Sequence, residues 1–367
     1  MKKLQNLLFT LVLLLTANLC FSQNIAEKGY SNNQIDTDSI SSLNLYIEDH
    51  TEQLNIKIIV SNNQLKYLLP YGDGKSASVK TNLSICYGFR LTYKNLSARV
   101  RIRPNLSATD QENKGNTDHF TFGFDVLKHN WAHFFEYSYR RGYYIDNTNF
   151  ITGEDLGNFH IQLPNLTTNI FNGVSQYKFN KNYSIKAVEY YNEIQLKSAG
   201  TFMPGINYTY YTYKDANKEI LGDGSIGSRN PYNDYKGLTL IIEPGYYYTF
   251  VLDKYFFVNV FAAPGVGVDF YNDKEFDTVN NTSTDENYSR AFLSFKTGAS
   301  IGYNRKQFYF GSEFKYQVFN KKEISLQPSK TIFQVFVGYR FKAPKQVSKP
   351  LDYIEDKVLG LKKRDNY

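Results

Sequence analysis

The sequence predicts an all-β fold, an antiparallel transmembrane β-barrel of the outer-membrane type with about 12 strands, within a range of about 10–14. Composition is the first observation behind this prediction. The chain holds 32 Tyr, 28 Phe and 1 Trp, yet its mean hydropathy is −0.46. The second observation is an apolar pattern of period two from residue 82 onward, and the third is an alternation of short and long polar connections. Barrel strands combine these features because lipid-facing and lumen-facing residues alternate along each strand.

Residues 1–22 have the features of an export signal. Lys2 and Lys3 precede an apolar core at Leu7 to Leu19, and Cys20-Phe21-Ser22 supplies small residues before a cut at Gln23. The core is shorter than the roughly 20 residues of a transmembrane helix. We therefore expect a cleaved signal peptide and delivery to the outer membrane of a Gram-negative bacterium. Lipid attachment at Cys20 is the alternative, disfavoured because the residue before it is not small.

Charge and cysteine content exclude other classes of protein. The formal charge of +7 loses two units with Lys2 and Lys3, and no basic run typical of nucleic-acid binding remains. Cys86 is the only cysteine after the signal, so no internal disulfide is expected.

The mature chain divides into an extension and a barrel. Residues 23–80 are predicted to form an N-terminal extension, in which Ile56 to Val60 either adds an edge strand or belongs to the extension. Residues 81–342 are predicted to form the barrel, beginning with Leu83 to Tyr93, where apolar and polar residues alternate. Such segments run for about 10 to 16 residues, enough for a tilted bilayer crossing of about 9–11. Strands of soluble proteins are nearer 5 or 6 residues, so a secreted soluble β-protein is the less favoured alternative.

The connections follow the barrel pattern of short turns at one end and long loops at the other. Counting strands from the N-terminal side and from the C-terminal side gives results that disagree between residues 183 and 236. Tyr183 to Tyr213 therefore holds either a miscounted strand or an irregular crossing. Short turns are expected at Lys94-Asn95, His129-Asn130, Asn180 to Asn182, Asp253-Lys254 and Asn304 to Lys306, and long loops near 104–118, 146–165, 214–236, 272–287 and 320–330.

The last predicted strand ends in the aromatic residues Tyr339 and Phe341. This pair resembles the terminal signal that outer-membrane assembly machinery reads, and that machinery is an expected partner. Residues 343–367 are predicted to be a charged periplasmic tail.

Three segments carry a family resemblance: Arg141 to Asn147, Tyr177 to Ser184, and Gln195 to Phe202. They resemble the uncharacterised bacterial family DUF4421 over most of the mature chain. The resemblance implies a membrane β-barrel and supplies no activity, cofactor or catalytic residue. Its most specific part is the motif Gln195, Lys197, Ser198, Ala199 and Gly200, in which Leu196 stands where a second lysine is expected.

Charged residues in the polar phase of the strands are predicted to face the lumen. An arginine facing lipid near the midplane costs roughly 2–4 kcal/mol, and opposite charges confined in a lumen tend to pair. The favoured prediction is a structural or surface-binding barrel with a charge-paired, largely filled lumen. The alternative is a small-solute channel with an anion preference, because cations outnumber anions. The predicted lumen residues are Arg90, Arg99, Arg101, Arg103, Asp125, Glu136, Arg140, Glu243, Asp269, Lys296, Glu313, Lys315 and Arg340.

A third hypothesis is a membrane-embedded, lipid-acting hydrolase with Ser198 as its nucleophile. Such chemistry needs a histidine within hydrogen-bond reach, and none is a convincing partner, so a non-enzymatic barrel is favoured. Asp125, His129 and His133 recur at intervals of four, but this spacing converges only on a helix, so no metal site is expected. No cofactor and no nucleic acid are expected; the expected partners are outer-membrane lipid and lipopolysaccharide.

Overall fold

The computed structural model describes residues 45–71, 75–83, 85–104, 107–214, 234–277, 282–320 and 329–360, all within one compact unit. The predicted signal peptide lies outside the described residues. The described elements are β1 (Ile47–Asp49), β2 (Gln53–Tyr71), β3 (Lys75–Lys80), β4 (Cys86–Tyr93), β5 (Leu96–Ile102), α3 (Ala108–Lys114), β6 (Asp118–Lys128), β7 (Trp131–Ile145), α4 (Thr148–Thr152), β8 (Gln162–Tyr177), η1 (Lys186–Tyr190), β9 (Glu193–Gln195), β10 (Ala199–Lys214), β11 (Asp234–Asp253), β12 (Phe256–Asp277), β13 (Thr282–Asn304), β14 (Phe308–Asn320), β15 (Ser329–Lys342), α5 (Lys345–Tyr353) and η2 (Ile354–Val358).

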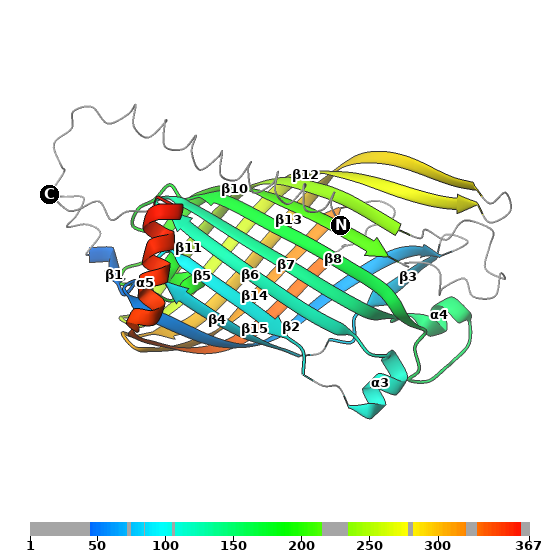
Figure 1. Cartoon of the computed structure of the whole chain (residues 1–367), viewed down its shortest axis with the longest axis horizontal. Helices are drawn as coiled ribbons and strands as arrows, with labels where there is room; N and C mark the ends of the chain where they lie inside the picture. The colour runs from blue at the N-terminus through cyan, green and yellow to red at the C-terminus, as the bar shows by residue number, and fades with distance from the viewer. Residues whose placement is uncertain are drawn as a thin grey trace. The chain divides into compact units, whose positions relative to one another are not determined.

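Twelve antiparallel strands close into a barrel in the order β2-β4-β5-β6-β7-β8-β10-β11-β12-β13-β14-β15, and β15 pairs with β2. This confirms the predicted all-β barrel and its number of strands. β3 stands outside the ring and pairs with β2 and with the last residues of β7. Figure 1 shows the tilted strands, with α3 and α4 at one end, which we call the loop end, and α5 at the other, the turn end. No described helix is long and apolar enough to cross a membrane.

The barrel begins earlier than the predicted boundary at residue 81. Ile56 to Val60 lies within β2, where Ile58 faces Val337 of β15 and Phe89 of β4 in register. Sequence periodicity obscured this strand because Ile59 points inward and is only 1% exposed, so apolar residues from both faces run together. Its position is fixed by the closing pair of strands, which are far apart in the chain.

Side chains alternate between the two faces of the barrel wall as predicted. On β6, Phe120 and Phe122 are exposed on the outer face, whereas Thr121 and Asp125 are buried inside. The last outward residues of β15, Val337 and Tyr339, are exposed in the same way. An outer face of this kind is typical of a barrel embedded in lipid.

The connection between β8 and β10 is an irregular crossing, the second of the two alternatives for Tyr183 to Tyr213. Residues 178–198 fold into the barrel at the turn end, and we call them the plug. They contain the one-turn π-helix η1 and the strand β9, which pairs with β1. Apolar plug residues such as Ile185 and Val188 pack against the inward-facing Met203, Tyr247 and Phe261 of the wall. The hydrophobic core of the turn end therefore lies inside the barrel.

The beginning of the predicted C-terminal tail is ordered against the turn end. Leu351 and Leu359 pack against Leu96 and Val126, which stand beside the first turns of the barrel. Figure 1 shows α5 lying across the ends of the strands there. This docking combines apolar burial with hydrogen bonds from the turn: Lys94 donates to Asp352, and Asn95 donates to Glu355.

Candidate functional site

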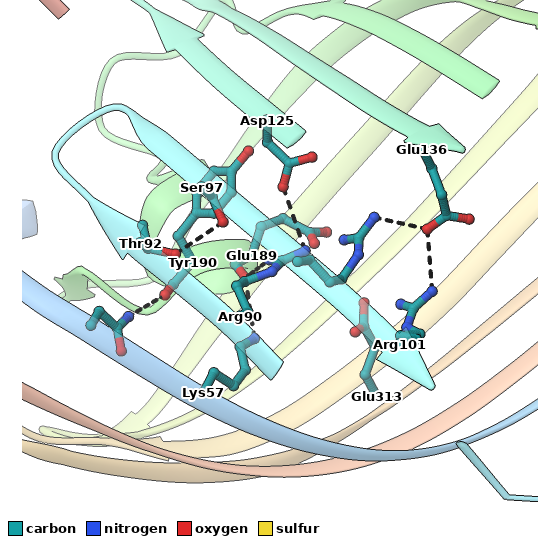
Figure 2. Close-up of polar contacts among 12 residues, drawn as sticks. Lys57, Arg90, Thr92, Ser97, Arg101, Asp125, Glu136, Glu189, Tyr190 and Glu313 are labelled. Atoms are coloured by element: carbon teal, nitrogen blue, oxygen red, sulfur yellow. Dashed lines mark hydrogen bonds and ion pairs between the residues drawn. The ribbon is translucent and has the colours of Figure 1, made fainter. Parts of the chain in front are cut away.

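The candidate site is the lumen between the plug and the loop end. Carbonyl groups at the end of η1 face the wall, and wall cations bind them. Arg90 of β4 donates through Nη1 to the main-chain carbonyl of Glu189 over 2.7 Å, and Lys57 of β2 donates to the same oxygen over 3.2 Å. Carbonyls at a helix end lack intrahelical partners, so cations satisfy them and complement the helix dipole. Figure 2 shows both contacts.

The residue that ends η1, Tyr191, is held in an unusual conformation. It has φ 59° and ψ 33°, a left-handed geometry that residues other than glycine adopt infrequently. Its ring stacks on Tyr309, with centroids 4.7 Å apart and planes 11° apart, and Lys57 Nζ lies 4.3 Å from its centroid. Asn55 Nδ2 donates to the carbonyls of Tyr190 and Tyr191 over 2.5 and 3.1 Å. The surrounding wall thus compensates for the strained turn.

Arg90 also pairs with a buried carboxylate. Its Nη2 lies 3.5 Å from Asp125 Oδ2, and the two side chains are 6% and 1% exposed. Neither oxygen of Asp125 has a hydrogen-bond partner among the described residues. Arg99 and Arg90 both attract this buried carboxylate electrostatically, and Arg90 links it to the plug.

Glu136 of β7 is the centre of a second cluster. Its Oε2 accepts from Arg99 Nη2 over 2.8 Å and from Arg101 Nη1 over 3.2 Å, and its Oε1 lies 3.9 Å from Lys330 Nζ (Figure 2 labels Glu136 and Arg101). Arg99 reaches Glu136 across Gly123, which lies between them in the strand register. A β-carbon at Gly123 would lie 2.7 Å from Arg99 Nη2, so glycine makes room for this contact.

Other lumen charges form pairs between strands and the plug. Lys315 Nζ lies 3.1 Å from Glu189 Oε1 and also pairs with Glu313, to which Gln334 donates. Farther along the wall, Lys296 Nζ lies 3.8 Å from Glu243 Oε2. Asp269 Oδ1 accepts hydroxyl hydrogen bonds from Tyr211 over 2.9 Å and Thr239 over 2.7 Å.

Arg340 and Arg103 stand apart from these pairs, as does Arg140, which is described below. Arg340 is fully buried, but its partners are carbonyls of the plug and of the turn after β13, together with the Asn304 side chain. Arg103 lies beyond the end of β5, near the loop end, where Nη2 donates to Asn116 Oδ1 over 2.8 Å. Arg340 is therefore a structural clamp at the turn end, and Arg103 belongs to the rim.

Between the plug and the loop end the lumen keeps a cavity of about 250 Å³. Eight cationic side chains and four carboxylates from the described residues line it. Arg140 is among these cations and is 3% exposed, yet its Nε has no hydrogen-bond partner in the described part of the chain. The described lining of this cavity therefore carries a surplus of positive charge.

Three lumen residues were missing from the sequence prediction: Lys57, Glu189 and Lys330. Lys330 shares its phase with Gln334 and Arg340 of the same strand, so extending the alternation back from Phe333 by three residues would have found it. Lys57 was hidden because β2 was assigned to the extension. Glu189 lies in the plug, where strand alternation carries no information.

The family-like motif shapes the junction between the plug and β10. Gln195 Oε1 accepts from Ser184 N over 2.8 Å, and its Nε2 donates to Asn182 O over 2.7 Å. Ser198 Oγ accepts from Val251 N over 2.9 Å. Ala199 and Gly200 begin β10, and Lys197 Nζ lies 5.5 Å from the ring centroid of Tyr46. These contacts give the motif a role in positioning the plug.

Neither the serine nor the histidines form a recognisable reactive site in the described residues. No hydrogen bond joins Ser198 to a histidine within the described ranges. His133 Nδ1 lies 2.9 Å from Ser175 Oγ on the neighbouring strand, away from Ser198 in the sheet. In the same part of the chain, no group of three or more His, Cys, Asp or Glu side chains is arranged to hold a metal ion.

A family model described as "Domain of unknown function (DUF4421)" matches residues 34–341. The chain belongs to the DUF4421 family. The match covers the plug, the barrel and the motif at Gln195, which confirms the resemblance read from these residues. No curated protein matches the sequence at a significant level.

Several solved barrels resemble this DUF4421 protein at low identity. Ail, the attachment invasion locus protein of Yersinia pestis, is 11% identical, with 80% of this chain and 99% of that chain covered and a TM-score of 0.19. The translocator domain of autotransporter NalP from Neisseria meningitidis is 13% identical, with coverages of 79% and 88% and a TM-score of 0.39. LpxR from Salmonella typhimurium is 11% identical, with coverages of 78% and 100% and a TM-score of 0.28. At these values the likeness extends to the barrel architecture only.

Proposed function

We propose that this DUF4421 protein is an outer-membrane β-barrel of a Gram-negative bacterium that is closed at rest and serves a structural or surface-binding role. A cleaved signal peptide at residues 1–22 would export it, and the assembly machinery would insert it by way of the terminal strand. Its outer face would contact lipid, and its loop end would lie beside lipopolysaccharide.

The plug is the observation that carries this proposal. Tyr183, Tyr190 and Tyr191 are at most 2% exposed inside the barrel. Wall residues four strands apart in the ring bind the plug's main chain. Arg90 of β4 donates to the carbonyl of Glu189, and Asn304 of β13 donates through Nδ2 to Glu193 O over 2.9 Å. We infer that a segment held in this way obstructs the lumen at the turn end, so passive conduction is not expected.

Single-channel conductance in a planar bilayer tests the closed state. The refolded mature protein is compared with a variant in which residues 178–198 are replaced by a flexible Gly-Ser linker of about eight residues. This length spans the distance from the end of β8 to the start of β10, because Gln176 pairs with Gly205 and Ala199 lies six residues before that pair. Heat-modifiable migration on gels shows that each protein is folded. The exposed-turn variant Lys254→Gln is the matched control. We expect silence from the wild type and the control, and steady conductance from the plug-replaced variant.

Two results would contradict the proposal. Steady, anion-selective conductance of the wild type that weakens in an Arg99/Arg101/Arg103→Ser variant would favour a channel. A folded plug-replaced variant that stays silent would show that the plug is not what closes the barrel. Lipid turnover that is lost in Ser198→Ala would instead support the hydrolase hypothesis.

A further inference from the structure

We propose that the lumen cavity contains a binding site for a small tetrahedral oxyanion of the phosphate or sulfate type, formed by Arg101, Arg140 and Lys330. This goes beyond the closed-barrel role and does not depend on the plug, because the site is defined by wall residues of β5, β7 and β15. The ligand class is identified by the guanidinium groups, which bind such anions through two parallel hydrogen bonds.

The first argument is the local imbalance of charge. Arg99, Arg101 and Lys330 all approach one carboxylate, Glu136, at 2.8, 3.2 and 3.9 Å. Lys330 also experiences repulsion from the charges of Arg101 and Arg140. Clustered like charges that are shielded from water are costly unless a counter-charge is present. Arg99 is also attracted by Asp125 and Glu189, which leaves Glu136 facing Arg101, Arg140 and Lys330. A bound dianion would offset the two positive charges that remain.

The second argument is the state of Arg140. Arg140 lines the cavity and is 3% exposed. Its Nε has no hydrogen-bond partner among the described residues, and Glu136 attracts the guanidinium only at longer range, without a described ion pair. In strand register it lies opposite His119 and Thr168, neither of which is a carboxylate. A buried arginine without an anionic partner is rare in folded proteins, so its position indicates a ligand.

The third argument is space. The cavity of about 250 Å³ exceeds the share of one water in the liquid, about 30 Å³, by roughly eightfold. It therefore has room for a tetrahedral anion with several waters. Polar side chains without charge, including Ser138 and Gln334, line the same cavity and can complete the hydrogen bonds.

The test is a titration of the folded mature protein with sodium sulfate or sodium phosphate in detergent. Ionic strength is held constant with sodium chloride, and calorimetry and the thermal midpoint of heat-modifiable migration are the readouts. The matched control for Arg140→Gln is Arg141→Gln, because Arg141 is the next residue of the same strand and its side chain is exposed.

We expect saturable sulfate binding to the wild type and to Arg141→Gln. In Arg140→Gln the dissociation constant is expected to rise at least about tenfold, the effect of removing one charge-assisted hydrogen bond. Without sulfate, Arg140→Gln should be no less stable than the wild type, because it removes an unpaired buried charge. Lys330→Gln, nearer the loop end, provides a second variant if Arg140→Gln does not fold.

The site is ruled out if sulfate stabilises no more than chloride, or if Arg140→Gln and Arg141→Gln bind sulfate equally. Equal binding of acetate and sulfate by the wild type would overturn the assignment to a tetrahedral oxyanion. A conducting wild type that still binds sulfate through Arg140 would contradict the closed barrel and leave this site in place.

Discussion

Arg90 in the barrel wall donates a hydrogen bond of 2.7 Å to the main-chain carbonyl of Glu189 in the plug. The two residues are far apart in the chain and meet only because the connection between β8 and β10 folds inward. The same guanidinium faces Asp125 at 3.5 Å, so one cation both neutralises a wall carboxylate and closes the end of η1. This arrangement makes the plug part of the lumen charge network.

Removing the Arg90 contact is expected to loosen the plug. The variant Arg90→Gln/Asp125→Asn is compared with Asp125→Asn alone, so that no unpaired carboxylate remains in either protein. A hydrogen bond from a charged group contributes about 1.5–3 kcal/mol, so hydrogen exchange of the amides in residues 186–192 should be about ten- to hundredfold faster in the double variant. Equal exchange in the two proteins would show that Arg90 does not hold the plug.

The stacked ring of Tyr191 is expected to matter more than its hydroxyl. Tyr191→Phe keeps the stack on Tyr309 and the cation contact of Lys57, so plug exchange should change by less than about twofold. Tyr191→Leu loses the aromatic pair, worth about 0.5–1.5 kcal/mol, and leaves a partly empty space. It should speed exchange at least about tenfold. An effect of Tyr191→Phe as large as that of Tyr191→Leu would contradict this assignment.

Strand alternation assigns charged residues to the lumen wall but does not indicate which residues they contact. Arg99 and Arg101 were placed inside because lipid exposure of an arginine is costly, and both point inward. The pairing of Glu136 with Lys330 joins β7 to β15 across the lumen, and only the closed barrel brings these strands together. Arg340 was placed on the correct face, but its partners are carbonyls that exist only because the plug folds inward.

The plug itself carries a weaker signal in the sequence. A loss of alternation after Tyr183 indicates that the chain leaves the wall, but periodicity does not state whether it turns inward or outward. The direction follows from packing: Tyr183, Ile185 and Val188 find apolar partners only inside the barrel. Such partners come from several distant strands, so local patterns cannot reveal them.

Gly123 is expected to limit the size of the side chain that fits beside the contact between Arg99 and Glu136. A β-carbon there would lie 2.7 Å from Arg99 Nη2, an atom at the end of a flexible side chain. Gly123→Ala should therefore be tolerated, whereas Gly123→Val should lower the unfolding free energy by about 1–3 kcal/mol through overpacking. Urea titrations of refolding in detergent measure this difference.

A double-variant comparison isolates the steric origin of that effect. In an Arg99→Ala background the larger side chain at position 123 meets open space, so the added cost of Gly123→Val should fall to less than about half. A cost that is unchanged in this background would locate the strain in the strand itself and not in Arg99.

The docked tail is expected to respond to pH through Glu355. Burial raises the pKa of this carboxyl, against the hydrogen bond from Asn95 and the charge of Lys94, which lower it. Because its pKa is raised, the Glu355 carboxyl of the docked tail holds its proton more tightly than the same carboxyl does when the tail is undocked. Docking is therefore strongest below the ordinary value of 4.5 and weakens as the pH rises through the raised value.

This docking is measured by the hydrogen exchange of the amides in residues 347–359 between about pH 4 and pH 8. The exchange rates are corrected for the intrinsic dependence of amide exchange on pH. Protection in the wild type should decrease with rising pH, and Glu355→Gln should abolish most of that decrease because it keeps an oxygen for Asn95 without a charge.

Asp352→Asn is the control for the partly exposed ion pair with Lys94, which lies at 2.6 Å. Its loss should lower protection only about two- to fivefold, because burial of Leu351 and Leu359 still holds the tail. A wild type and Glu355→Gln with the same pH profile would show that Glu355 is not the group that responds.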